Sequence, residues 1–455
     1  MRHSNRAPQG NQWDAAPEEG PEMDKDLLIT TAHSTESVPP VDKPGFLIRG
    51  VNRRAWQVTL LSLGGWLLVN MDGSLFNLNY PLIQADLGLS DDDIGNLYAI
   101  IYAVGAISTI LSGPFMDRFG RKPIFQLCMF AAAAGSLITA GAGGFLILLF
   151  ARGITQAGAT TEWMAGQVMV AEEAPAKARG RLIGLAQIGY PLGFFAGSLL
   201  SFLIVPHFGW RLLFVIGVIP VFLMLWARRS VDETERFRAE AAAEKAAPQQ
   251  RRIRFVQLLA PDLRRSAILA AIWHLVYAFG VAGILSYLPS VYSHFGVSLE
   301  HTYISSAVAT GLAAVGYYLC AYVGDRIGRR EAAALWLTLG AVAGGLLAFQ
   351  GTNVVLLTIF YSGVYFFTIG HITAAAGFAA EVFPTRVRAT GANLVAGMEW
   401  VGFVAAALAG PRLFAGIGYT ATLLIWLVIC PLVAAACAMG MRRVAPGASL
   451  EAIAQ

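Results

Sequence analysis

The sequence predicts an all-α membrane protein with twelve transmembrane helices, arranged as two pseudo-symmetric six-helix bundles. Of its 455 residues, 56% are hydrophobic and 14% are charged, whereas soluble globular proteins carry about 25% charged residues. Apolar runs of about 20 residues can cross a bilayer, whose dry interior admits only helices and closed barrels. Because these runs are continuous rather than alternating in segments of about ten residues, they indicate helices and exclude a β-barrel.

The expected helices follow from twelve apolar runs that are separated by polar connections. Four cysteines lie in or beside these runs, which is typical of small buried side chains rather than of a disulfide framework. The polar N-terminal segment has no apolar core, so we do not expect a cleavable signal peptide. The predicted spans are residues 56–80, 94–115, 123–142, 144–170, 181–205, 211–228, 266–290, 303–323, 332–350, 354–380, 389–410 and 418–440.

The distribution of basic residues predicts the orientation. Of the 33 Lys and Arg residues, 30 lie in the N-terminal tail, in the connections after the even-numbered runs, or in the C-terminal tail. Basic residues concentrate on the cytoplasmic side of membrane proteins. Both termini are therefore expected in the cytoplasm, which requires an even number of spans. The basic residues sit in short loops, so they do not indicate nucleic-acid binding.

A long charged connection near the middle of the chain divides six runs from six. It is expected to be a cytoplasmic linker that tethers two bundles. The predicted organisation is a disordered cytoplasmic tail (1–54), an N-terminal bundle (55–228), the linker (229–265), a C-terminal bundle (266–441) and a cytoplasmic C-terminal tail (442–455).

Two loop motifs recur at nearly the same offset. Asp117-Arg118-Phe-Gly120-Arg121 follows the second run, and Asp325-Arg326-Ile-Gly328-Arg329 follows the eighth, 208 residues later. Glu172, Pro175 and Arg179 follow the fourth run, and Glu381, Pro384 and Arg388 follow the tenth at an offset of 209. The chain is therefore interpreted as a tandem duplication of a six-helix unit, with its axis along the membrane normal.

These paired loops resemble the signatures of the major facilitator superfamily over about residues 55–443. Within it, Glu162-Trp-Met-Ala-Gly, the stretch from Arg179 to Gly193, and Gly209-Trp210-Arg211 are most similar to metabolite:proton symporters of the sugar-porter, organic-acid and sialate type. The resemblance implies two bundles around a central cavity that is lined by spans 1, 4, 7 and 10.

The resemblance also implies a gating role for the repeated loops, because salt bridges between bundles close one face of such transporters. The alternative is that their basic residues only follow the positive-inside rule. The expected gating residues are Asp117, Arg118, Gly120, Arg121, Glu172, Arg179, Asp325, Arg326, Gly328, Arg329, Glu381 and Arg388.

Charged groups at membrane depth are functional candidates because their burial is costly. Asp72 in the first span is the favoured proton-coupling residue, with a structural ion pair as the alternative. Arg152 lies at a similar depth in the fourth span and either pairs with Asp72 or binds an anionic substrate. Glu162 is a further coupling candidate that either serves transport or faces a neighbouring span. Glu399 is the third coupling candidate, and it stands near a place where related symporters often carry arginine.

Other polar and aromatic residues of the spans are candidates for substrate contact, although aromatic residues in membrane helices more often serve packing. His371 and His274 are likewise candidates either for substrate contact or for packing, and a titrating role is a further interpretation of His274. With Arg152, the substrate-binding set is Gln156, Gln187, Tyr190, His274, Tyr277, Tyr361 and Tyr365.

The resulting hypothesis is secondary active uptake of a small metabolite coupled to protons, by alternating access, in a bacterial inner membrane. An organic acid is the favoured substrate, and a sugar-like solute is possible. A proton-coupled exporter, an uncoupled facilitator and a membrane sensor are the alternatives. The sequence has no nucleotide-binding loop, metal-ligand cluster or positioned nucleophile, so an enzyme and a cofactor are not expected. The expected partners are the solute, protons and lipid, and the chain is expected to be a monomer.

Overall fold

The computed structural model describes residues 51–119, 121–175, 178–219, 258, 260–261, 263–383 and 388–443. All of them fall within one compact unit, Pro44–Gln455. Over these residues the regular elements are helices, and no strand occurs. They are α1 (Arg53–Leu87), α2 (Asp91–Phe119), α3 (Arg121–Ala140), α4 (Phe145–Glu173), α5 (Arg179–Gln187), α6 (Gly189–Ile216), α9 (Arg264–His294), α10 (Leu299–Ile327), α11 (Arg329–Ala348), α12 (Val354–Val364), η3 (Tyr365–Ile369), α13 (Ile372–Val382), α14 (Arg388–Leu424), η4 (Ile425–Ile429) and α15 (Cys430–Gly440).

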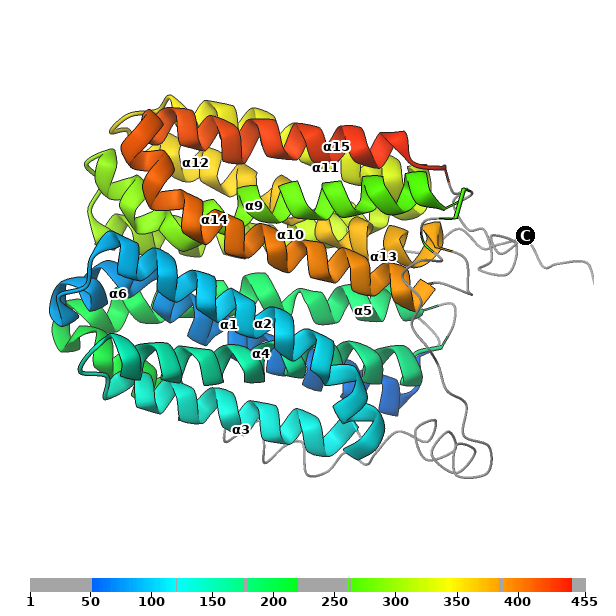
Figure 1. Cartoon of the computed structure of the whole chain (residues 1–455), viewed down its shortest axis with the longest axis horizontal. Coiled ribbons are helices and arrows are strands. Elements are labelled where there is room, and N and C mark those ends of the chain that lie inside the picture. Colours follow the sequence, from blue (N-terminus) through cyan, green and yellow to red (C-terminus); the bar gives the residue numbers. More distant parts are fainter. Residues whose placement is uncertain are drawn as a thin grey trace, which may run out of the picture. The chain divides into compact units, whose positions relative to one another are not determined.

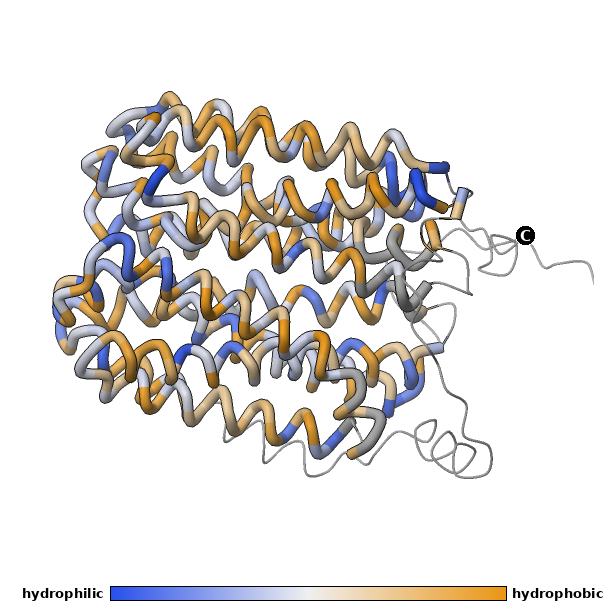
Figure 2. Tube along the Cα trace, viewed as in Figure 1, coloured by the Kyte–Doolittle hydropathy of each residue, from blue (hydrophilic) through white to orange (hydrophobic). Residues whose placement is uncertain are grey.

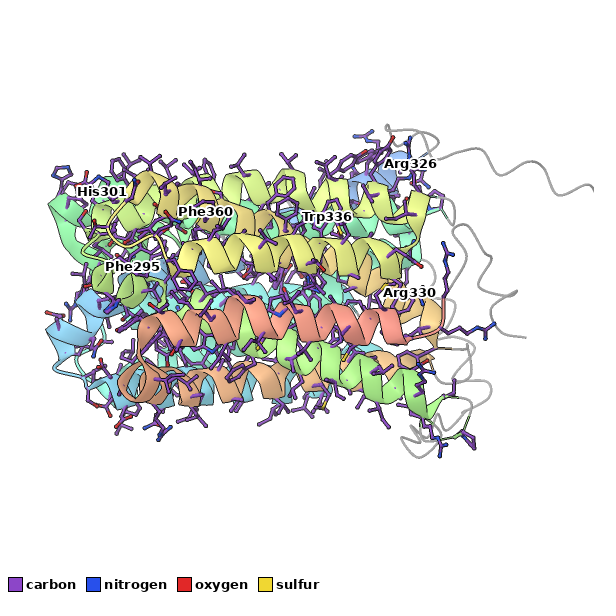
Figure 3. The ribbon with its side chains drawn as sticks, turned by 90° about the horizontal axis from the view of Figure 1, so that it is seen from above. Phe295, His301, Arg326, Arg330, Trp336 and Phe360 are labelled. Carbon is purple, nitrogen blue, oxygen red and sulfur yellow. The ribbon has the colours of Figure 1, made fainter. Side chains whose placement is uncertain are left out.

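The helices lie alongside one another (Figure 1), and hydrophobic residues predominate along their lengths (Figure 2). Arg326 and Arg330 lie at one end of the helices, and Phe295 and His301 lie at the opposite end (Figure 3). We call these the Arg326 end and the His301 end. The basic loop motif after α10 is therefore at the opposite end from the turn that joins α9 to α10.

Nine helical ranges among the described residues are long and apolar enough to cross a membrane. The all-helical prediction is thus confirmed for the described part of the chain, whereas the count of twelve spans stays a prediction. The nine ranges are Arg53–Leu87, Asp91–Ser112, Lys122–Ala140, Arg181–Ile216, Arg264–His294, Leu299–Ile327, Arg329–Ala348, Val354–Ala375 and Leu394–Gly440.

The difference from twelve has identifiable causes. The range Leu394–Gly440 contains most of predicted span 11 and all of span 12. Helix α14 is interrupted at Gly418, and Figure 1 shows the chain turning back before it continues into α15. The range Arg181–Ile216 contains span 5 and the start of span 6, and residues 220–228 of span 6 lie outside the described residues. Helix α4 covers predicted span 4 but is not among the nine ranges, since its interior is polar and includes Arg152 and Glu162.

Corresponding close contacts recur in the two halves of the chain. A methyl group in place of the hydrogen of Gly193 on α6 would overlap the carbonyl oxygen of Leu67 on α1. A methyl group at Gly402 on α14 would overlap the carbonyl oxygen of Leu275 on α9 in the same way. Each residue of the second contact follows its counterpart by 208 or 209 positions. The α1–α6 contact and the α9–α14 contact are therefore equivalent.

The bends in α6 and α14 also correspond. Gly209 in α6 has φ 74° and ψ 176°, and Gly418 in α14 has φ 80° and ψ 170°. These positive φ values favour glycine, because a Cβ atom would be strained there. The two residues are 209 positions apart. Both helices are thus interrupted at equivalent points.

The π-helix η3 explains why the offset changes from 208 to 209. Before it, Gly135 lies in close contact with Thr155, and Ala343 lies in close contact with Gly363. Ala343 follows Gly135 by 208 positions, and Gly363 follows Thr155 by the same number. After it, the loop motif with Glu381 follows its counterpart by 209. A π-turn widens the helix and accommodates one extra residue. The extra residue therefore lies in the segment between Gly363 and Glu381 that contains Tyr365–Ile369.

Two groups of helices make most of their contacts internally. In the first helix group, α1–α6, α3 packs on α4 and α1 packs on α6. In the second helix group, α9–α15, α9 packs on α14 and α15, and α11 packs on α12 and α15. The groups meet where α2 contacts α14 and where α6 contacts α10. The boundaries of the two predicted bundles stay a prediction.

Candidate functional site

Asp72 and Arg152 form an ion pair inside the first helix group. The Arg152 Nη1 atom lies 2.7 Å from Asp72 Oδ2, which joins α4 to α1. Ser136 on α3 donates a hydrogen bond of 2.6 Å to the other carboxylate oxygen. Asp72 is 7% exposed and Arg152 is 5% exposed. The sequence left open whether Arg152 pairs with Asp72 or binds an anionic substrate, and in the structure it pairs with Asp72.

Aromatic rings cover the guanidinium group of this pair. Its central carbon lies 4.7 Å from the centre of the Phe76 ring and 5.9 Å from that of Phe214. Such contacts stabilise a cation electrostatically. The Nε atom of Arg152 has no hydrogen-bond partner among the described residues. Arg152 is therefore directed at Asp72 and enclosed by α1, α3, α4 and α6 in this conformation.

Glu162 faces neighbouring helices of the first group. Its side chain is fully buried, and a methyl group at Gly65 on α1 would overlap its carboxylate. The same methyl group would lie 2.8 Å from the ring of Phe125 on α3. The structure thus places the Glu162 side chain of α4 against α1 and α3. Of the two alternatives that the sequence left open, this is the one in which Glu162 faces neighbouring helices.

Glu399 lies where the two helix groups meet. Three tyrosines lie near enough for a charge on its carboxylate to be felt at their hydroxyl groups, namely Tyr190 on α6, Tyr277 on α9 and Tyr317 on α10. Its neighbour Trp400 donates a hydrogen bond of 3.1 Å to Thr109 on α2. We call Glu399 with Tyr190, Tyr277 and Tyr317 the Glu399 cluster, which draws residues from both groups.

Several predicted substrate residues lie beside this cluster on the side of the first group. The Trp163 ring nitrogen donates a hydrogen bond of 3.0 Å to Gln187. The Trp66 ring stacks in a tilted arrangement on both Trp163 and Tyr190, with centres 5.7 and 6.2 Å apart. Gln156 approaches Trp400, since both side chains converge on Gly105 of α2. Gln156, Gln187 and Tyr190 therefore belong to one aromatic region.

The predicted residues of the second group form a second aromatic region. The rings of Tyr361 and Tyr365 have centres 5.1 Å apart. His371 meets the edge of Tyr277 at 4.3 Å. His274 and His371 hydrogen-bond through Nδ1 to carbonyl oxygens of their own helix, at 2.9 and 2.6 Å. Both histidines are buried, which fits the packing interpretation.

Sequence reasoning missed Tyr317, Tyr102 and Trp400 as site residues. Tyr102 lies 6.3 Å from Trp400 between ring centres, and it is an electrostatic neighbour of Tyr190. An aromatic residue in an apolar helix looks the same whether it packs or binds. The available signal was position, since Trp400 directly follows the unusual acid Glu399.

The predicted gating residues are described only in part. In the second copy of the loop, Arg329 and Asp325 are 3.8 Å apart, and the Arg326 guanidinium lies 4.3 Å from the Tyr322 ring centre. Gly328, with φ 111°, separates α10 from α11. Glu172 lies in the last turn of α4. The side chains of Asp117, Arg118, Arg121, Arg179, Glu381 and Arg388, and the whole of Gly120, lie outside the description.

A layer of neutral hydrogen bonds joins the two groups nearer the His301 end. Tyr102 on α2 shares a hydrogen bond of 2.7 Å with Ser286 on α9, and Tyr80 on α1 contacts Ser290 in the same way. We call this the hydroxyl layer, with two further links: Tyr303 donates to Asn79, and Ser198 donates to Ser306 at 2.9 Å. Among the described residues, the bonds that join the groups on this side are therefore neutral.

Two pockets open beside this layer. One has a volume of about 440 Å³ and is lined by residues that include Pro81, Ser293 and His294. The other has a volume of about 240 Å³ and is lined by residues that include Asp91 and Pro411. Ser290 and Tyr419 line both. Both pockets therefore border the hydroxyl layer at Ser290, and the second also borders it at Tyr80.

A bundle of apolar helices with a buried ion pair and a polar aromatic cluster between two repeated groups defines a multi-pass membrane transporter. A family model described as Major Facilitator Superfamily matches residues 63–392. The chain belongs to the major facilitator superfamily.

Its relatives are transporters of small metabolites rather than enzymes. A putative metabolite transport protein of Haemophilus influenzae is 28% identical over 76% of this chain and 86% of its own length. A probable 4-methylmuconolactone transporter of Cupriavidus pinatubonensis is 27% identical over 72% and 76%. A sialic acid transporter of Escherichia coli is 26% identical over 75% and 84%. The resemblance to metabolite symporters is thereby confirmed at the level of the family and its transported solutes.

Proposed function

We propose that this chain imports a small organic metabolite together with protons by alternating access. The observation that carries the proposal is the buried ion pair between Asp72 and Arg152. In the proposed architecture, twelve spans form two bundles and both termini are cytoplasmic. The Arg326 end then faces the cytoplasm, where its basic residues satisfy the positive-inside rule.

The ion pair supports coupling because proton binding to Asp72 would strongly change the free energy of the pair. A proton on Asp72 would neutralise the carboxylate and leave Arg152 as a buried cation without its partner charge. A buried charge that loses its partner is strongly destabilised. Proton binding would therefore favour a rearrangement of α1 against α4, and thus a different relative position of the two groups. Such a change is what alternating access requires.

The hydroxyl layer supports one assignment of state. With the Arg326 end in the cytoplasm, the hydrogen bonds of Tyr80, Tyr102 and their serine partners close the external face. The charged loops would then control the opposite face. In this proposal one face is closed by neutral hydrogen bonds and the other by the charged loops, so each can open without the other.

The relatives favour an organic acid or a similar oxygen-rich solute. Their names refer to 4-methylmuconolactone, niacin, cis,cis-muconate and sialic acid. The aromatic region around Tyr190 and Gln187 offers flat surfaces and a side-chain amide for a small ring or unsaturated acid. We propose such a solute as the substrate, with a sugar-like solute as the second choice.

The test uses the purified chain in proteoliposomes that contain a pH-sensitive dye. A panel of carboxylates, aromatic acids and sugars is added outside, and proton entry and solute uptake are followed together. We expect one solute class to drive proton entry, and Asp72→Asn to abolish it. The control is Asp86→Asn, since Asp86 pairs with Arg211 at the exposed His301 end.

Three results would contradict the proposal. Solute uptake without proton entry would indicate an uncoupled facilitator, and normal proton entry with Asp72→Asn would place coupling elsewhere. Solute efflux driven by inward protons would instead support the exporter. The control variant should match the unmodified chain in every arm.

A further inference from the structure

Glu399 is a carboxylate at membrane depth for which the described residues supply no cation. Among them, no Lys, Arg or His forms an ion pair or hydrogen bond with it. The nearest basic residues on its own helix are Arg388 and Arg412, which lie 11 and 13 positions away. At 1.5 Å per residue these are about 16 and 20 Å along the axis. Asp72, by contrast, has its arginine at 2.7 Å.

The surroundings of Glu399 are aromatic, and they come from both helix groups. Tyr190, Tyr277 and Tyr317 lie near it on three different helices, and its neighbour Trp400 donates a hydrogen bond to Thr109 of the first group. Tyr190 is also its counterpart in the repeat, since the two residues are 209 positions apart and three positions before the matching Gly193 and Gly402. The carboxylate therefore lies where the two groups face each other, and it is partly rather than fully buried.

A carboxylate beside aromatic rings is suited to bind a positively charged nitrogen. The carboxylate supplies the counter-charge, and ring faces attract cations within about 6 Å of their centres. An ionised carboxylate at membrane depth is costly until such a partner arrives. An anionic solute would instead meet repulsion here. Because Arg152 is occupied by Asp72, the described residues at this depth offer an anion no free guanidinium.

We propose that Glu399 binds a cationic nitrogen of the transported solute, so that the substrate is an amine or a protonated nitrogen heterocycle. This inference rests on the proposed transport function for its physiological meaning, and it specifies the substrate class. A solute that carries both this cationic nitrogen and the acid group of the proposed function is a zwitterionic organic acid. It replaces the coupling role that the sequence suggested for Glu399, because that role would need a proton there rather than a solute.

The test compares three probes that share one ring: benzylammonium, 4-(aminomethyl)benzoate and benzoate. The full chain is placed in lipid nanodiscs, and binding is measured by the change in tryptophan fluorescence, since Trp400 adjoins Glu399. We expect the two probes with an ammonium group to bind at least about tenfold more tightly than benzoate. Equal or tighter binding of benzoate would overturn the proposal.

Variants of Glu399 separate binding from folding. Glu399→Gln should lose at least about tenfold in affinity for benzylammonium, with benzoate unchanged or tighter. Glu399→Asp should retain part of the ammonium affinity, and Asp86→Asn should retain all of it. Thermal unfolding without probe checks that each variant is folded. Unchanged ammonium affinity in folded Glu399→Gln would overturn the proposal.

Proton movement on the same preparations distinguishes this inference from the proposed function. Failure of Asp72→Asn to change coupling would contradict symport through Asp72 but leave ammonium binding by Glu399 intact. Loss of proton movement in Glu399→Gln with unchanged ammonium binding would identify Glu399 as a proton site and overturn the inference alone.

Discussion

Each helix group has an acid at membrane depth, but the two acids lie in different surroundings. The first group encloses Asp72 with its own arginine, whereas Glu399 in the second group has no cation among the described residues. The counterpart of Asp72, 208 positions later, is Gly280, which packs against the backbone of Trp426. The duplicated backbone has thus kept its contacts while its charges diverged. This difference matches the two roles proposed above, proton coupling at Asp72 and solute binding at Glu399.

The largest expected effect breaks the ion pair of the first group. Arg152→Met keeps most of the side-chain volume but leaves the Asp72 carboxylate buried without its partner charge. Removing one member of a buried pair costs about 3–5 kcal/mol. We therefore expect the free energy of unfolding to fall by that amount at neutral pH, measured by denaturant unfolding in detergent.

The control for this prediction removes both charges. Asp72→Asn combined with Arg152→Met should recover most of the lost stability, because no isolated charge remains. Glu399→Gln should be neutral or stabilising in the same assay, since Glu399 has no described partner to lose. A destabilisation by Glu399→Gln as large as that of Arg152→Met would contradict the comparison between the groups.

The fold was largely predictable because it depends on hydropathy and on spacing. Continuous apolar runs indicated the helices, and two loop motifs at offsets of 208 and 209 indicated the repeat. The one-residue difference between these offsets had no explanation in the sequence, and the π-helix at Tyr365–Ile369 supplies it. The bends at Gly209 and Gly418 were not predictable, since 48 glycines give no sign of which adopt positive φ.

The candidate site was predictable in its residue types but less so in its geometry. Depth along two helices suggested that Asp72 and Arg152 are level, but depth does not fix which way each helix is rotated. The same limit left Glu162 open between the solute path and a neighbouring helix. Tyr317 went unnoticed because its aromatic ring in an apolar helix gives the same pattern in packing and in binding.

A medium effect sharpens the equivalence of the repeated contacts. Gly193→Ala and Gly402→Ala should each push α6 from α1 or α14 from α9, because the added methyl meets a carbonyl oxygen. Overpacking of this kind costs about 1–3 kcal/mol. We expect the two variants to lose similar amounts of stability in denaturant unfolding.

The matched control is Gly73→Ala on α1, where a methyl group would meet nothing within 4 Å. This variant should be neutral or slightly stabilising, since alanine favours a helix over glycine by about 1 kcal/mol. A large loss in only one of Gly193→Ala and Gly402→Ala would show that the two contacts now differ in strength, in addition to the difference in charged residues between the two helix groups.

The smallest effect concerns the hydroxyl layer between the groups. Tyr102→Phe removes the hydrogen bond to Ser286 and keeps the ring, so the closed state at the His301 end should lose about 1 kcal/mol. Opening there would expose Ser306, which is 1% exposed. We expect Ser306→Cys, added as a reporter, to react about fivefold faster with a polar maleimide in the Tyr102→Phe background.

Tyr98→Phe provides the comparison within the first group. Tyr98 lies on the same helix as Tyr102, but its hydroxyl donates to Asn77 at 3.0 Å and does not reach the second group. Its loss should leave the labelling rate of the Ser306 reporter unchanged, although it also removes one hydrogen bond. If both variants accelerated labelling equally, the acceleration would reflect a general loosening of helix α2 rather than the loss of a hydrogen bond in the hydroxyl layer. If Tyr102→Phe alone does so, the neutral bonds between the groups set how readily this face opens, independently of the buried charges within each group.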